Sequence, residues 1–215
     1  MKLRIPCSFV AGLTGRNRFK DKWQTIAALL VKYYPDTLPL YLTQAEIHRI
    51  QSKHFYLFKQ KSALVKSCLE GKPTYVPVRY RNQVHGILTE KNYDFENQHQ
   101  FISKDFGNFS LYGQIDGQRG EQVVEVKARM RYFYIGEHDR VQLGTYMLIK
   151  GLDGVLLQDL KGKKKETFFP LAKTKRHMAP ILCELERVAK QIHKIFEGGL
   201  EGTDRTLLRF TLKNV

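Results

Sequence analysis

The feature that most constrains the fold is a change in hydrophobic spacing close to residue 99. Before this point, apolar residues recur at helical intervals in residues 18–34 and again from Thr43 to about Glu70, where Thr43 and Glu46 form a capping-box pattern. After it, residues 99–127 contain short runs of alternating character that are separated by turn residues, as is typical of strands. The sequence therefore predicts a mixed α/β fold.

The remaining elements follow from the same spacing rules. Helices are expected over about residues 83–96, 137–150 and 174–197, and strands over 154–160, 167–171 and 205–213, with a tight turn at GKKKE. At 215 residues, the chain is expected to form a single domain with one core. We expect a mainly helical part over residues 1–98, a sheet core with one helix over 99–171, and a final helix and strand over 172–215.

The most informative run is Val124-Glu125-Val126-Lys127. Side chains alternate between the two faces of a strand, so the two valines share one face and Glu125 shares the other with Lys127. The run Gly117-Gln118-Arg119-Gly120 predicts a hairpin that brings Asp116, at the end of the preceding strand, beside Glu125. The sequence thus places two carboxylates and a lysine close together.

Two converging carboxylates repel each other unless a cation lies between them. Mg²⁺ prefers carboxylate, water and phosphate oxygens, and it lowers the pKa of a bound water that attacks a phosphodiester. Lys127 is expected to orient that water or to stabilise negative charge on the phosphate. The alternative is a surface hairpin with a cross-strand Glu–Lys pair, and an acid and a base two residues apart favour this alternative when they are taken on their own.

Three motifs in order distinguish these alternatives. They are Gly113-x-Ile115-Asp116, Glu125-x-Lys127 and Gln142-x-x-x-Tyr146 in the next expected helix. Together they resemble the PD-(D/E)XK nuclease superfamily, and within it the RecB-like and phage lambda exonuclease-like branch. The resemblance implies a restriction-endonuclease-like core, with a mixed central sheet flanked by helices and preceded by a helical region. It also implies that Gln142 and Tyr146 face the active site.

Two further segments extend the resemblance. The run from Gly86 to Glu90 is similar to a helix that supplies an additional acidic metal ligand, and His85 stands where some RecB-like relatives have a histidine. Residues 8–19 resemble the opening segment of phage-type recombination exonucleases, which contributes to the wall that binds DNA ends. We therefore expect this segment to belong to the mature enzyme, although the lack of acids before Asp21 also fits a mitochondrial presequence.

The resemblance implies Mg²⁺ as the cofactor, with Mn²⁺ able to substitute. An iron–sulfur cluster and a zinc site are not expected, because the three cysteines are far apart and form no Cys-x-x-Cys pair. The departures from the superfamily pattern are Gln114-Ile115 in place of a proline before Asp116, and Glu125 in place of an aspartate. This branch tolerates both.

The chain has 36 Lys and Arg against 21 Asp and Glu, a formal net charge of +15, so a polyanion is the expected partner. Tyr132, Phe133 and Tyr134 are expected either to stack on bases or to pack in the core. The basic residues expected to contact DNA phosphates are Arg16, Arg18, Arg129, Arg131, Arg140, Lys163, Lys164 and Lys165, with Lys161 beside the last three.

The sequence favours a metal-dependent exonuclease that acts at DNA ends in recombination, replication or repair, with a virus, phage or mobile element as a fitting source. A structure-specific endonuclease on the same fold and a non-catalytic DNA-binding module are the alternatives. Expected partners are DNA, a single-strand annealing protein or helicase, and further copies of the chain. No membrane span is expected, and a reducing compartment that holds DNA, such as the nucleus or cytoplasm of a host, is the expected location.

Overall fold

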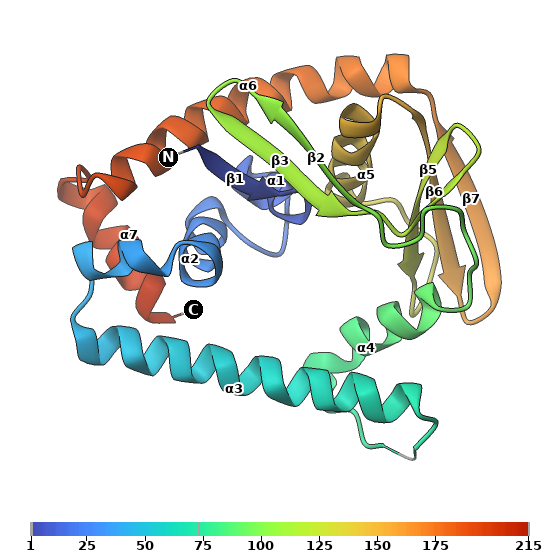
Figure 1. The fold of residues 1–215 in the computed structure, drawn as a ribbon, viewed down its shortest axis with the longest axis horizontal. Helices are drawn as coiled ribbons and strands as arrows, with labels where there is room; N and C mark the ends of the chain where they lie inside the picture. The colour runs from blue at the N-terminus through green and yellow to red at the C-terminus, as the bar shows by residue number, and fades with distance from the viewer. Residues whose placement is uncertain (1, 73, 215) are drawn as a thin grey trace.

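The computed structural model describes residues 2–72 and 74–214. Figure 1 shows two β-sheets on one side of a long helix, α6, with the helices of the N-terminal half around and below them. The N-terminal half contains β1 (Leu3–Pro6), α1 (Cys7–Leu13), α2 (Lys22–Tyr33), the 3-10 helix η1 (Pro35–Leu40), α3 (Gln44–Leu69) and α4 (Val78–Glu90).

The second half contains the remaining strands together with three helices. They are β2 (Phe101–Phe106), β3 (Phe109–Gln114), β4 (Gly117–Arg119), β5 (Gln122–Ala128), α5 (Glu137–Lys150), β6 (Asp153–Leu160), β7 (Lys163–Phe169), α6 (Leu171–Phe196) and α7 (Gly202–Asn214). The mixed α/β class expected from the sequence is confirmed.

The strands form two mixed sheets. The first has the order β1-β3-β2, in which β3 pairs parallel with β1 and antiparallel with β2. The second has the order β4-β5-β6-β7, in which β5 and β6 are parallel neighbours and the two outer pairs are antiparallel. Helix α5 connects β5 to β6, as a parallel pair requires, and it packs against strands of both sheets.

One main core joins these layers. It includes apolar side chains from β1, α1, α2, β3, α5 and α6, and its members are nearly all fully buried. Helix α6 approaches α5 closely at Gly144, where an added Cβ would lie 2.9 Å from the sulfur of Met178. The missing side chain at this position lets the two helices pack in contact, which fixes α5 between α6 and the sheets.

Several expected helices are confirmed. Helix α3 begins after Thr43, whose hydroxyl accepts a hydrogen bond from the Glu46 backbone N–H, while the Glu46 side chain accepts one from Thr43 N–H. These reciprocal bonds are the expected capping box. Helices α2, α5 and α6 also lie where the spacing predicted them. The expected helix at 83–96 was displaced, because α4 begins at Val78 after Pro77 and ends at Glu90.

The strand predicted at residues 205–213 was wrong, because this segment is helix α7. Its buried residues are Leu208, Thr211 and Leu212, which recur at helical rather than alternating intervals and pack against α2. The Lys213 ammonium lies 2.6 Å from Glu46 at the start of α3, so α7 joins α2 to α3. The turn predicted at GKKKE was also misplaced: the chain turns at Lys161-Gly162, and the next three lysines lie on β7.

The N-terminal strand β1 was not predicted. It covers only four residues, and its isoleucine and leucine are fully buried between β3 and the helices.

Within residues 2–72 and 74–214, no helix combines the length and apolar composition that a membrane crossing needs.

The helical assignment of the C-terminus has a testable consequence for stability. Leu208 is fully buried, whereas its neighbour Leu207 is 38% exposed. We expect Leu208→Ala to lower the free energy of unfolding by about 2–5 kcal/mol through lost burial and a residual cavity. Leu207→Ala should change it by less than about 1 kcal/mol. Urea unfolding followed by circular dichroism measures both, and equal effects would contradict the α7 packing.

Candidate active site

The candidate site begins on strand β5, whose two faces differ. Val124 and Val126 pack with Tyr93 and Leu157 in a small cluster, while Val123 lies in the main core. Glu125 follows on the face of Val123 and is only 2% exposed. The alternation predicted from the sequence therefore holds, and it buries a carboxylate at the edge of the main core.

Asp116 reaches Glu125 by a route other than the predicted hairpin. Strand β3 belongs to the first sheet, and Gly117–Arg119 is itself the strand β4 that pairs with β5. The hairpin turn lies at Gly120, which has φ +53°. The expectation that the strand before Asp116 pairs with β5 was wrong.

The pairing of β4 with β5 ends at Gly117 and Val124, so the next backbone N–H of β5 on that edge has no strand partner. The Asp116 carboxylate accepts this hydrogen bond, at 2.7 Å from Val126 N. Asp116 thus lies where the chain crosses from the first sheet to the second, and its side chain takes the place of the missing strand.

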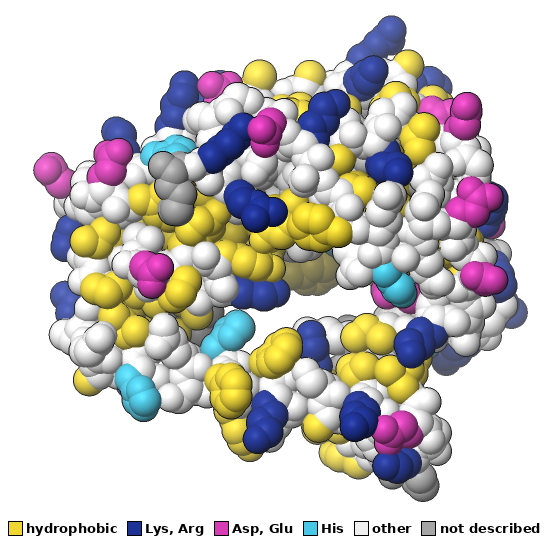
Figure 2. All heavy atoms as spheres, in the orientation of Figure 1, with side chains coloured by type: hydrophobic (Ala, Val, Ile, Leu, Met, Phe, Trp, Pro, Cys, Tyr) yellow, Lys and Arg dark blue, Asp and Glu magenta, His cyan; other side chains and the backbone are white. Residues whose placement is uncertain are grey.

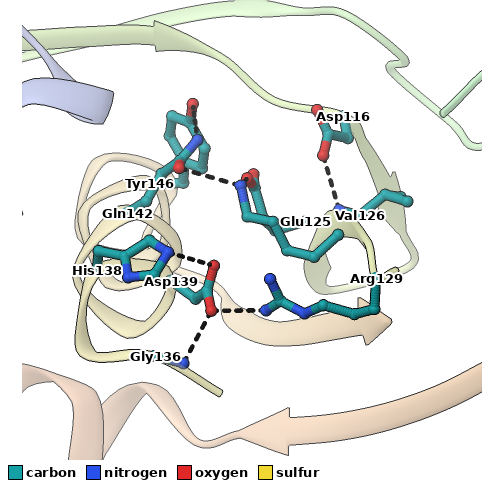
Figure 3. A network of polar contacts seen from close by, with 10 residues as sticks. Asp116, Glu125, Val126, Arg129, Gly136, His138, Asp139, Gln142 and Tyr146 are labelled. Carbon is teal, nitrogen blue, oxygen red and sulfur yellow. Dashed lines mark hydrogen bonds and ion pairs between the residues drawn. The ribbon is translucent and has the colours of Figure 1, made fainter. Parts of the chain in front are cut away.

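A chain of polar contacts connects β5 to α5. Lys127 Nζ donates to Glu125 Oε1 and also to Gln142 Oε1 at 3.1 Å, and Gln142 Nε2 donates to the Tyr146 hydroxyl at 3.2 Å. In Figure 3, Asp116 lies on one side of Glu125 and the α5 side chains Gln142 and Tyr146 lie on the other. The three sequence motifs therefore meet at one place.

Gly113, the first residue of the first motif, has a steric role at this place. A Cβ at this position would lie 2.7 Å from the Tyr146 ring and 3.2 Å from the Cys7 sulfur. The glycine lets Tyr146 pack directly on β3, where the ring is only 4% exposed. Because Tyr146 is held there, its hydroxyl is fixed where Gln142 donates to it.

Glu90, at the end of α4, is electrostatically coupled to the same carboxylates. Burial and repulsion from Glu125 raise the pKa of Glu90 above its ordinary value. Burial and repulsion from Glu90 raise the pKa of Asp116. Burial and repulsion from Asp116 raise the pKa of Glu125, although Lys127 opposes this shift. Three acids thus disfavour one another's ionisation around one lysine.

This arrangement fits a hard divalent cation. The second carboxylate oxygen of Glu125 is buried and has no hydrogen-bond partner among the described residues. Mg²⁺ is usually held by one or two carboxylates together with water and substrate phosphate. The part of the chain that the structure describes holds no ready cluster of three or more His, Cys, Asp or Glu ligands. The side chains that could hold such a cation are Asp116 and Glu125, and Glu90 is electrostatically coupled to both.

The loop between β5 and α5 is fixed by a buried ion pair that sequence reasoning did not identify. Arg129 donates to Asp139 at 2.6 Å, with the side chains 8% and 0% exposed. The same carboxylate oxygen accepts from Gly136 N–H, and His138 Nε2 lies 3.4 Å from the other oxygen. Figure 3 shows these contacts below Glu125. An aspartate three residues after a glycine that precedes a helix was the available sequence signal.

A cleft of about 570 Å³ lies beside this loop. Three predicted DNA-binding residues line it, namely Arg18, Arg129 and Arg131, together with His85 of α4. Asn82, Met130, Tyr132, Tyr134 and the Ala128 backbone region complete its wall, and of these Tyr132 is 61% exposed rather than packed in the core. Arg18 and Arg131 give the cleft a positive charge, since the described residues that line it include no acid and Arg129 is paired with Asp139.

The other predicted DNA-binding residues are not part of this cleft. The Arg16 guanidinium donates to Thr14 O, and Arg140 lies near the Phe169 ring at the end of β7. Lys163, Lys164 and Lys165 are exposed on β7, and the Lys164 ammonium lies 4.6 Å from the Tyr93 ring centre. Arg129 lines the cleft, but its guanidinium is already paired with Asp139.

No family model and no curated protein matches the sequence. Similar solved structures include SSO0001, at 14% identity and a TM-score of 0.45 over 89% of this chain and 77% of that one. A phage-related exonuclease from Haemophilus somnus 129PT has 11% identity and a TM-score of 0.43, over 90% of this chain and 96% of its own.

A third similar structure, provisionally described as an exonuclease, comes from Eubacterium rectale. It has 10% identity and a TM-score of 0.40, over 92% of this chain and 77% of its own. These three are similarities of fold at low sequence identity.

The acid cluster predicts how stability depends on pH when no metal is bound. Below its ordinary pKa of 4.5, Glu90 is protonated in both the folded and unfolded states. The folded state binds this proton more tightly than the unfolded state does, because the pKa of Glu90 is raised by folding. The stability gained in this way is present at low pH and is lost as the pH rises through the folded-state pKa. We therefore expect Glu90→Gln to match the wild type near pH 4 and to unfold at a higher temperature than the wild type at pH 8.

Thermal unfolding in EDTA across this pH range measures the difference. Glu201→Gln is the control, because Glu201 is an exposed carboxylate away from the site. A Glu90→Gln variant that is less stable than the wild type at pH 8 would show that Glu90 makes a favourable ionised contact instead.

Proposed function

We propose that this chain is a metal-dependent DNA exonuclease of the PD-(D/E)XK type. The observation that carries the proposal is the meeting of Asp116, Glu125 and Lys127 with Gln142 and Tyr146 at the junction of the two sheets. Burying a carboxylate without a partner is costly, so one free, buried Glu125 oxygen next to a second carboxylate favours a cation-binding role.

Asp116 and Glu125 would hold the metal, Mg²⁺ or Mn²⁺, with Glu90 close enough to influence it. When bound, such an ion polarises the phosphate and makes a bound water more acidic. Asp116 is fixed by its hydrogen bond from Val126 N–H, so one carboxylate oxygen orients the side chain and the other remains for a ligand. His85 lines the cleft with the arginines, and its buried Nε2 has no hydrogen-bond partner among the described residues, so we propose it as a further candidate ligand.

Lys127 acts at the scissile phosphate. Its ammonium is oriented by Glu125 and by Gln142, and Gln142 is held in turn by the Tyr146 hydroxyl. A lysine fixed in this way stabilises negative charge that develops on the phosphate or orients the attacking water. Gln142 and Tyr146 are positioning residues, because they act through Lys127.

DNA is the proposed substrate because the cleft with arginines in its wall begins at Ala128, the residue after Lys127 on β5. Arg18 and Arg131 project into it from different segments, and its aromatic wall suits an unpaired base at a DNA end. We also propose a setting in recombination, replication or repair, in a reducing compartment that contains DNA. A single-strand annealing protein or a helicase is the proposed partner, and an assembly of several copies is compatible with the same site.

The exonuclease assignment predicts a requirement for DNA ends. With Mg²⁺, purified protein should degrade linear duplex DNA and leave covalently closed circular DNA of the same sequence intact. Gel electrophoresis over time measures this, and EDTA should abolish it. Cutting of the closed circle would favour a structure-specific endonuclease, and binding without cleavage in any divalent ion would favour a non-catalytic module.

Removing the lysine tests the site itself. We expect Lys127→Ala to lower the cleavage rate by at least roughly a hundredfold, because a positioned charge or proton donor at the phosphate is lost. DNA affinity in EDTA should stay within a fewfold of the wild type. Lys175→Ala, at an exposed lysine on α6, is the matched control and should cleave normally.

Asp116→Asn provides a second test with less risk to the fold. The asparagine oxygen can still accept the hydrogen bond from Val126 N–H, but the negative charge is removed. Loss of Mg²⁺-dependent cleavage is expected, with an unfolding temperature in EDTA at pH 8 that is no lower than that of the wild type, because one of the mutually repelling charges is removed. Normal cleavage by both variants would place the active site elsewhere.

A further inference from the structure

Helix α3 is an unusual part of the fold because only its beginning is buried. Among its 26 residues, Ile47 and Ile50 are the buried ones. Its start packs on η1 and its later part packs on α4. Figure 2 shows a hollow between the lobe that α3 and α4 form and the rest of the molecule. Much of α3 therefore presents its side chains to solvent.

The composition of α3 is unlike that of an ordinary solvent-facing helix. Residues 47–69 contain no Asp or Glu, although they include five Lys or Arg. The helix also exposes aromatic side chains, with Phe55 67% exposed and Phe58 59% exposed. Figure 2 shows hydrophobic and basic side chains intermingled on this lobe. Single exposed apolar residues are common, but two neighbouring phenylalanines within a stretch of helix that has no acid need a separate explanation.

The two phenylalanines lie on the side of α3 that faces away from α4. Gln60 marks the side toward α4, because it accepts hydrogen bonds from Arg79 at 2.6 Å and from Tyr80 at 3.3 Å. Phe55 and Phe58 are three residues apart, and Lys59 is four residues after Phe55, so these three side chains are neighbours on the helix surface. The contacts with α4 therefore leave this surface uncovered.

We propose that this surface of α3, defined by Phe55, Phe58 and Lys59, binds single-stranded nucleic acid. The two rings offer faces on which unpaired bases stack. Lys59 is their neighbour on the helix surface, where it can contact the phosphate next to the stacked bases. A duplex fits less well, because its bases are already stacked on one another. The inference concerns binding on α3 and stands apart from cleavage at Asp116, Glu125 and Lys127.

Charge decides between a nucleic acid and other occupants of this surface. A second copy of this chain carries the same strongly basic character, with a formal net charge of +15, so pairing through α3 would bring like charges together. Residues 47–69 of α3, with five cations and no acid, instead complement a continuous polyanion. The exposed rings add stacking with bases, which phosphate contacts alone do not supply.

Fluorescence anisotropy in EDTA tests the proposal without cleavage. The probes are a labelled oligothymidylate and a labelled blunt duplex of equal length. We expect the double variant Phe55→Ala/Phe58→Ala to bind the single strand at least roughly tenfold more weakly than wild type, since each base–aromatic stack contributes measurably to affinity. Affinity for the duplex should change by less than twofold. Lys59→Gln should reduce the salt dependence of single-strand binding by about one phosphate contact.

Phe210→Ala is the matched control, because Phe210 is 66% exposed and also lies on a helix, α7. It should bind both probes like the wild type. Phe55→Trp supplies a direct readout of stacking: its added fluorescence, after subtraction of the Trp23 signal measured in the wild type, should be quenched by the single strand. Circular dichroism should show the same unfolding temperature for all exposed-residue variants.

Unchanged single-strand affinity in the double variant would overturn the proposal. So would a wild-type dimer that the double variant converts to a monomer with no change in binding, because that result assigns the surface to a second copy. If the double variant loses single-strand binding and the wild type cleaves no DNA at all, this inference is upheld and the proposed nuclease activity is refuted. The two conclusions are therefore tested separately.

Discussion

The site depends on one buried electrostatic contact, the pair that Lys127 forms with Glu125. Along one face of β5 the environment changes in steps, from fully buried Val123 to Glu125, at 2% exposure, and then to Lys127, whose side chain is 22% exposed. A carboxylate at such a position is tolerated only with a partner, because burial of an isolated charge is costly. The end of this strand therefore forms a boundary between the core and a charged surface.

The junction of the two sheets supplies the rest of the site. The chain leaves the first sheet after β3 and enters the second at β4, and Asp116 is the residue at this crossing. Its carboxylate completes the hydrogen bonding of β5 at Val126. Helix α5 packs on both sheets and brings Gln142 to Lys127. Asp116, which accepts the unpaired N–H of β5, and helix α5, which packs on both sheets, thus meet at the same end of β5.

Local patterns in the sequence predicted the local features well. Alternation placed Glu125 and Lys127 on one face, and the capping residues Thr43 and Glu46 located the start of α3. The position of Asp116 near Glu125 was predicted for the wrong reason. A turn signal shows that two segments reverse, but it does not show which strands pair, and here the segment between Asp116 and Gly120 is itself a strand.

Features that depend on distant partners were not predictable in this way. The segment 205–213 contains residues common in strands, yet packing of Leu208 and Leu212 against α2 makes it helical. The short strand β1 is recognisable only once β3 is present beside it. Arg129 was expected to be free for DNA, and its partner Asp139 is ten residues away on the next helix. Each error has the same cause, a tertiary contact that no local pattern contains.

Helix α4 holds two parts of the molecule in place at once. It packs on α3 at one side and on β5 at the other, and its last residue is Glu90. The outlying lobe and the acid cluster consequently share a single support. Any shift of the lobe that moves α4 along β5 alters the distance of Glu90 from Asp116 and Glu125, and with it the repulsion among the three carboxylates. The geometry of a surface far from the carboxylates is in this way a determinant of the repulsion among them, and hence of how strongly the proposed site would attract a cation.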